Sequence, residues 1–174
     1  QEIEDRNKCA IESCRVIGAE PPFFLGFRDN CMDTVALLDV VQALENIIED
    51  VRPSIVYTHH SGDLNIDHKV THQAVMTACR PLPMSPIKEV YFFEVPSSSE
   101  YSLATPSEYF IPNYFVDISG EFDFKVKLLE IYKDEMRDFP NSRSIKGIKS
   151  LACYRGVSVG VSMAEAFTVG RLIK

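Results

Sequence analysis

Apolar residues recur along this chain with two spacings that alternate. Apolar positions three or four residues apart are typical of helices, and short runs of β-branched and aromatic residues are typical of strands. This pattern predicts helices at about 3–17, 35–51, 67–79, 124–139 and 145–152. It predicts strands at 21–27, 54–58, 88–95, 114–118 and 164–169. Residues 81–86 have the composition of a linker, and residues 156–161 are expected to form a loop against the functional site.

Several residues are suited to begin or interrupt these elements. Asp33 and Thr34 are candidate caps for the second helix, Asp67 for the third, and Ser142 to Ser144 for the last. Residues 96–113 form an unusually long connection, which is equally compatible with a surface excursion and with a substrate-facing lid.

The alternation of strands and helices also predicts the fold class. Helices of ten or more residues between strands indicate βαβ crossovers and a mainly parallel sheet. We therefore expect one α/β domain over residues 1–174, a Rossmann-like three-layer sandwich. Because the chain opens directly on a helical pattern at Gln1, we expect its leading strand to lie outside this sequence.

Composition and charge narrow the class of partner. The net charge is −7, from 18 basic and 25 acidic residues, which argues against a protein that grips nucleic-acid phosphates. No apolar run approaches the length of roughly 18 residues that a membrane span needs. The five cysteines form no CxxC pair, which predicts reduced thiols in a cytoplasmic protein. Small molecules are the expected partners, and homo-oligomerisation stays open.

The candidate chemistry is concentrated in residues 57–68, which place three histidines and two aspartates between a predicted strand and a predicted helix. The carboxyl ends of strands are the usual ligand-binding edge of an open α/β sheet. His59 and His60 alternate on an extended backbone, so only one of them can face that crevice. His68, at the head of the helix, has the best position for a metal ligand. His68 and His72 are four residues apart and could share a helix face, but the interpretation of His72 as a surface residue is favoured.

Residues 57–68 and the helix that follows resemble the second motif of a known family, the PIG-L/LmbE-like zinc-dependent N-acetylglucosaminyl deacetylases. The motif reads Tyr-Thr-His-His-Ser-Gly-Asp-Leu-Asn-Ile-Asp-His in this chain. Further segments similar to the family are residues 25–30, 140–144 and 155–167. The resemblance implies that His68 is a zinc ligand and that Asp67 supports the site.

Two departures from the family pattern matter. The family's first motif, His-Pro-Asp-Asp-Glu, which supplies one histidine and one aspartate to the metal and the general base, does not occur in these 174 residues. We interpret this as a segment outside the sequence. Asn65 stands where many members carry a histidine that acts on the amide, and His60 is the expected substitute.

The resemblance implies a metal-assisted hydrolysis that removes the acetyl group from an N-acetylated amino sugar. In this interpretation zinc activates water, while His60 and Asp67 are the catalytic candidates. The substrate-binding candidates are Arg28, Asp29, Asn65 and Arg143, each of which could equally serve a structural role. The alternative is a non-catalytic Rossmann-like module that binds a sugar or a protein. A nucleotide-binding domain is disfavoured because no GxGxxG segment is present.

Overall fold

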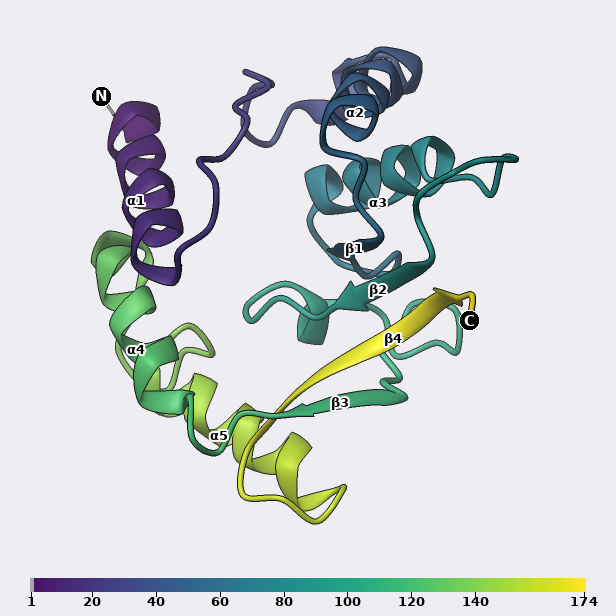
Figure 1. Cartoon of the computed structure of the whole chain (residues 1–174). Helices are drawn as coiled ribbons and strands as arrows, with labels where there is room; N and C mark the ends of the chain where they lie inside the picture. The colour runs from purple at the N-terminus through teal and green to yellow at the C-terminus, as the bar shows by residue number, and fades with distance from the viewer. Residues whose placement is uncertain (1) are drawn as a thin grey trace. The chain divides into compact units, whose positions relative to one another are not determined.

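A computed structural model describes residues 2–174 of the chain (Figure 1). The chain divides into two compact units. Unit 1 comprises residues 1–26 and 116–165, and unit 2 comprises residues 27–115 and 166–174. The expectation of one domain over residues 1–174 stays a prediction. None of the helices in residues 2–174 is long and apolar enough to cross a membrane.

Unit 1 is built from helices. It contains α1 (Glu2–Ile17), α4 (Phe122–Ile131), the 3-10 helix η3 (Lys133–Glu135) and α5 (Ile145–Val157). A cluster of Ile118, Phe122, Ile148 and Ala152 forms its apolar core. The helix predicted at 3–17 is confirmed. The helix predicted at 124–139 was too long, because α4 ends at Ile131 and only η3 follows it. Helix α5 continues to Val157, into the segment expected to be a loop.

Unit 2 carries most of the sheet and the two helices that lie beside it. Its elements are η1 (Met32–Thr34), α2 (Leu37–Val51), β1 (Ile55–His59), α3 (Ile66–Ala78), β2 (Glu89–Phe93) and η2 (Ser99–Tyr101). Helix α3 contacts both α2 and β1 (Figure 1). The core joins Val75 and Cys79 of α3 to Val90 of β2, and Ala74 to Val40 and Val41 of α2.

The four strands form one mixed sheet in the order β1-β2-β4-β3, with β3 at Tyr114–Asp117 and β4 at Ala164–Leu172. Strands β1 and β2 are parallel and in register, with Tyr57 opposite Tyr91. Strand β4 runs antiparallel to β2, so the expectation of a mainly parallel sheet was wrong. Strands β1 and β2 are joined through the single helix α3, as in a βαβ crossover, whereas β4 follows β3 and the two helices α4 and α5.

The strand predicted at 21–27 was also wrong, because this segment is irregular. Pro21 and Pro22 have no backbone N–H to donate to a ladder, and Gly26 has a positive φ of 74°. Phe23 and Phe24 are exposed, at 60% and 50%, and only Phe27 packs against the core. The other strands and the helix boundaries near residues 52, 66 and 145 agree with the sequence pattern.

Two predicted helix caps were wrong as well. Asp33 and Thr34 lie in the short helix η1, and Ala36 occupies the N-cap position of α2. Asn65 rather than Asp67 caps α3.

Candidate functional site

The site lies in unit 2, where β1 ends and α3 begins. Asn65 is the N-cap residue of α3, and its Oδ1 accepts hydrogen bonds from the backbone N–H groups of Asp67 (2.8 Å) and His68 (3.4 Å). This is the usual way in which an asparagine satisfies the unpaired donors of a first helical turn. The cap fixes where α3 begins and therefore places His68 in its first turn.

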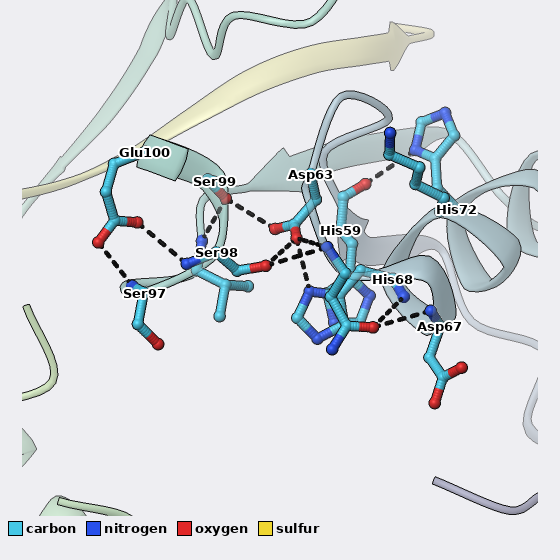
Figure 2. A network of polar contacts seen from close by, with 12 residues as sticks. His59, Asp63, Asp67, His68, His72, Ser97, Ser98, Ser99 and Glu100 are labelled. Atoms are coloured by element: carbon cyan, nitrogen blue, oxygen red, sulfur yellow. Dashed lines mark hydrogen bonds and ion pairs between the residues drawn. The ribbon is translucent and has the colours of Figure 1, made fainter. Parts of the chain in front are cut away.

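Asp63 is the most enclosed polar residue of the site, with 0% of its surface exposed. Its Oδ1 accepts the backbone N–H of Asn65 (3.0 Å) and the hydroxyl of Ser98, and its Oδ2 accepts the hydroxyl of Ser99 (2.8 Å). Figure 2 shows these contacts converging on the carboxylate. Burial would raise the pKa of Asp63, but the contact with His68 and the hydrogen bonds from Ser98, Asn65 and Ser99 outweigh it and hold that pKa well below its usual range. Asp63 is therefore an ionised, fully paired group.

His68 contacts this carboxylate directly. Its Nδ1 lies 3.0 Å from Asp63 Oδ1 (Figure 2). The contact has an ion-pair distance but lacks hydrogen-bond geometry, so Nδ1 has no hydrogen-bond partner among the described residues. Because an anionic oxygen this close repels a lone pair, the proton of a neutral His68 is favoured on Nδ1, and Nε2 keeps its lone pair. A histidine with one nitrogen held by a carboxylate is the usual arrangement of a metal-binding histidine.

His59, at the end of β1, is the second imidazole beside His68. The two rings stack with their centroids 4.1 Å apart and an interplanar angle of 19°. Burial, together with the neighbouring His68 and His72, lowers the pKa of His59 to about 4, although Asp63 opposes the shift. Among the residues that the structure describes, no hydrogen-bond partner meets the buried Nδ1 of His59.

His60, the sequence-based candidate, faces a different environment. Its side chain is 8% exposed, its Nε2 lies 3.0 Å from the carbonyl oxygen of Glu108, and its ring packs against Phe110. Successive strand residues point to opposite faces, so His59 rather than His60 shares the face of His68. The geometry agrees with the expectation that only one of the two histidines faces the site. That histidine is His59, whereas the sequence favoured His60.

Asp67 holds the segment before α2 in place. Its Oδ2 accepts the backbone N–H of Asn30 (2.6 Å), and its Oδ1 accepts that of Met32 (3.0 Å). Asn65 also reaches Asn30, through Nδ2 to Oδ1 at 3.5 Å. In Figure 2 the carboxylate of Asp67 points away from Asp63 and His68. Asp67 thus anchors a loop beside the site.

His72 does not share a site with His68. Its Nδ1 lies 2.8 Å from the backbone oxygen of His59, and its ring packs edge-on against Phe92. Burial lowers the pKa of His72, although the hydrogen bond to His59 opposes the shift. The side chain is half-buried, as expected for a partly exposed residue on the helix surface, and it supports β1.

The long loop after β2 closes over residues 60–65. A Cβ placed on Gly62 would lie well under 3.0 Å from the backbone of Glu108, a separation that real Cβ atoms do not show. Only glycine allows this approach. Together with the contacts of Ser98 and Ser99, it places parts of residues 96–113 against the turn at 62–65. Whether this loop faces a substrate stays a prediction.

The remaining substrate-binding candidates are divided between the two units. Arg28 and Asp29 are exposed in unit 2, just before Asn30, which Asp67 holds. Arg143 lies in unit 1, where its side chain contacts Glu135 at 3.2 Å and its backbone N–H donates to Asn141.

Tetrahedral zinc in a catalytic site takes three protein ligands. His68 offers one suitable nitrogen, but residues 2–174 contain no group of three or more His, Cys, Asp or Glu side chains that could hold a metal ion. The described residues therefore do not form a complete zinc site.

Sequence reasoning missed Ser98 and Ser99 as members of the site and treated Asp63 only as a turn residue. The signal for the serines was weak, because a run of three serines before a glutamate at 97–100 is typical of any polar loop. The signal for Asp63 was its position between a glycine and the helix cap, which is ordinary turn chemistry.

Comparison with known proteins agrees with the resemblance. Residues 1–79 match the family described as PIG-L, GlcNAc-PI de-N-acetylase. The chain is 31% identical over 136 residues to the "Uncharacterized deacetylase YaiS" of Escherichia coli (strain K12). That alignment covers 75% of this chain and 65% of the relative, so the chain spans slightly less than two thirds of that protein.

Solved structures share the fold. The N,N'-diacetylchitobiose deacetylase of Pyrococcus horikoshii has a TM-score of 0.71 and 19% identity, with 97% of this chain and 64% of that chain covered. GalB, the 4-carboxy-2-hydroxymuconate hydratase of Pseudomonas putida KT2440, has a TM-score of 0.69 and 22% identity, with 98% and 74% covered. At these identities the likeness establishes the fold alone, and the fold occurs in proteins named for different reactions.

Proposed function

We propose, from the premise that residues 1–79 of this chain belong to the PIG-L/LmbE-like family, that the protein hydrolyses the N-acetyl group of an amino-sugar conjugate. Water adds to the amide carbonyl, the C–N bond breaks, and acetate and a free amino sugar are released. The E. coli relative is named a deacetylase, and the P. horikoshii protein of similar fold is named for a diacetylated disaccharide. These names support an N-acetylglucosamine type of substrate.

One observation carries the proposal within the chain itself. His68 begins α3 with its Nδ1 against the buried carboxylate of Asp63, which leaves Nε2 unprotonated. A nitrogen held in this way can bind an ion or accept a proton at a fixed position. His59 stacks on His68 and is kept neutral by its lowered pKa of about 4.

Zinc is part of this proposal, with His68 as a ligand. The ion, when bound, would polarise the amide carbonyl and lower the pKa of a water molecule. The described residues contain no group of three ligands, so zinc held by His68 would need further ligands. The missing ligands are also the main support for the alternative, a non-catalytic module that binds a sugar or a protein.

The other proposed roles follow from position. Asp67 supports the site by holding residues 30–32, and Asn65 holds the first turn of α3. Arg28 and Asp29, exposed close to Asn30, are proposed to contact the sugar. His60 remains a candidate proton donor only if its hydrogen bond to Glu108 opens. His59 stacks on His68, but its lowered pKa of about 4 keeps it neutral, so it does not replace His60 as an acid. A cytoplasmic location is proposed from the five free cysteines.

The experiment is a direct assay of acetate release. Purified protein is incubated with zinc and a panel of N-acetylglucosamine conjugates, and acetate and free amine are both quantified. We expect release from at least one conjugate, and loss of release in His68→Ala. The matched control is Ser150→Ala, an exposed residue of α5 in unit 1, which should retain activity.

Two results would contradict the proposal. If His68→Ala turns over substrate at the rate of the unaltered protein, His68 is not part of the site. If no conjugate is hydrolysed but one binds, the non-catalytic alternative replaces the hydrolase.

A further inference from the structure

Two serines outside the region that matches the family, Ser98 and Ser99, make the only side-chain hydroxyl contacts to Asp63 in the part of the chain that the structure describes. Both are buried, each with 7% of its surface exposed. They lie on the turn that follows β2, 35 and 36 residues beyond Asp63 in the sequence. Serines in a polar loop are usually exposed to water. Two buried serines that contact a buried carboxylate so far away in the sequence therefore point to a specific role.

The direction of each hydroxyl proton is set by a second contact. Ser98 Oγ accepts the backbone N–H of Asn65 at 3.3 Å, and Ser99 Oγ accepts that of Val95 at 2.8 Å. A serine hydroxyl has one proton and two acceptor positions. Because each oxygen already accepts an N–H, its single proton is available for Asp63, which can only accept.

The turn that carries Ser98 and Ser99 is stabilised by hydrogen bonds between its own residues. The backbone N–H groups of Ser97 and Ser98 donate to the carboxylate of Glu100 at 2.7 and 3.1 Å (Figure 2). Ser97 has a positive φ of 68°, a conformation that a single residue adopts only when the surrounding contacts fix it. The hydroxyls of Ser98 and Ser99 are therefore presented to Asp63 by a preorganised turn.

These contacts also fix the orientation of the carboxylate. Ser99 binds Oδ2, while Ser98 and the N–H of Asn65 bind Oδ1, so the carboxylate plane cannot rotate without losing several hydrogen bonds. The same Oδ1 lies 3.0 Å from His68 Nδ1. The contact has an ion-pair distance but does not meet hydrogen-bond geometry. At this distance an unprotonated Nδ1 would turn its lone pair toward an anionic oxygen, so the placement of the carboxylate favours the tautomer with the proton on Nδ1.

We propose that Ser98 and Ser99 are positioning residues: by clamping Asp63 they hold His68 in one orientation and one tautomer, with Nδ1 protonated and Nε2 bare. The proposal rests on the proposed function for the meaning of that nitrogen, but its geometry concerns only the chain's own atoms. It places part of the site on the long loop after β2.

The test reads the tautomer of His68 without reference to turnover. Nitrogen-15 NMR of the histidine side chains is recorded on the metal-free protein at about pH 8, where unperturbed imidazoles are neutral. We expect the unaltered protein to show His68 in the Nδ1–H form alone. The Ser98→Ala/Ser99→Ala variant should show a mixture of both tautomers, and each single variant a smaller admixture.

Two further sets of variants make the result specific. Ser107→Ala removes an exposed hydroxyl of the same loop, 3.3 Å from Thr105 Oγ1, and should leave the His68 signals unchanged. If the alanine variants do not fold, Ser98→Cys and Ser99→Cys retain the side-chain volume but donate weakly, and should shift the same equilibrium. Ser98→Thr retains the hydroxyl and should restore the Nδ1–H form.

Failure of this inference is distinguishable from failure of the proposed function. If folded variants without both hydroxyls keep His68 entirely as Nδ1–H, the clamp is not what holds it, whatever the activity. If the tautomer shifts but the unaltered protein releases no acetate, the positioning stands and the hydrolase proposal falls. If both hold, kcat should fall about tenfold in the double variant with KM little changed, because the serines touch no substrate.

Discussion

Two turns of this molecule use the same local chemistry for different ends. The turn at residues 62–65, in unit 2, leads into α3 through the cap residue Asn65, and the turn at residues 141–144, in unit 1, leads into α5 through Ser144. In the second turn Asn141 Oδ1 accepts the N–H of Arg143, and Ser144 Oγ accepts the N–H of Gly147. Both side chains find their partners within three residues.

The first turn adds what the second lacks. Asp63 takes hydroxyl partners from residues 35 and 36 positions away, and Gly62 admits the backbone of Glu108. The difference teaches that a polar turn before a helix is by itself only a way to begin that helix. It becomes a candidate site when distant segments close over a buried charge.

The largest expected effect is at the buried carboxylate. Asp63→Asn keeps the shape but turns a donor toward hydroxyls and an imidazole that are themselves donors. We expect a loss of about 3 kcal/mol in the free energy of unfolding, measured by urea denaturation. Asp138→Asn, an exposed aspartate in unit 1, should change it by less than about 0.5 kcal/mol. If the two substitutions changed the free energy of unfolding equally, the buried contacts of Asp63 would not contribute to stability.

The next effect concerns the close approach of the two loops. Gly62→Ala forces a methyl group against the backbone of Glu108, and we expect a destabilisation of about 2 kcal/mol. Gly120→Ala, where a Cβ meets nothing within 4 Å, is the matched control and should be nearly neutral. A neutral Gly62→Ala would show that residues 96–113 do not press on the turn.

In the turn at 141–144 the expected effect is smaller and local. Ser144→Ala removes the cap of α5 and should cost about 1 kcal/mol in the free energy of unfolding. The imidazole 15N signals of His68 should not respond. A response there would break the distinction between the self-contained turn and the turn that closes a site.

A further effect, spread over the acidic pH range rather than tied to one substitution, is a dependence of stability on pH. His59 has its pKa lowered to about 4 in the folded chain, against 6.5 when unperturbed, and burial also lowers the pKa of His72. Between pH 4 and 6.5 the unfolded chain therefore binds a proton at His59 that the folded chain does not bind. The free energy of unfolding should therefore fall as the pH decreases from about 6.5 to 4.

Thermal denaturation across this range measures the slope, and His72→Gln should reduce it by removing one of the two groups. A stability that rises on acidification over the same interval would contradict the assigned burial of both imidazoles. Ser107→Ala, which alters no histidine, serves as the control and should keep the slope of the unaltered protein.

The sequence by itself determined the elements and the place of His68. Helical periodicity, the proline at position 53 and the capping serine at 144 act within a few residues, so α3, α5 and β1 were predictable from local spacing. The resemblance to the family likewise depended on a contiguous motif. The apolar composition of residues 21–27 led to the wrong prediction of a strand. Pro21 and Pro22 cannot donate to a strand ladder, and hydrophobicity alone does not form one.

The tertiary structure decided which neighbours those elements meet. It turned His59 rather than His60 toward His68, reversed β4 in the sheet, and brought two serines onto Asp63. None of these follows from local pattern, because the donors that stabilise a buried carboxylate come from segments tens of residues away. Local spacing determines the direction in which a side chain can point. Only the tertiary structure determines which partner groups lie in that direction.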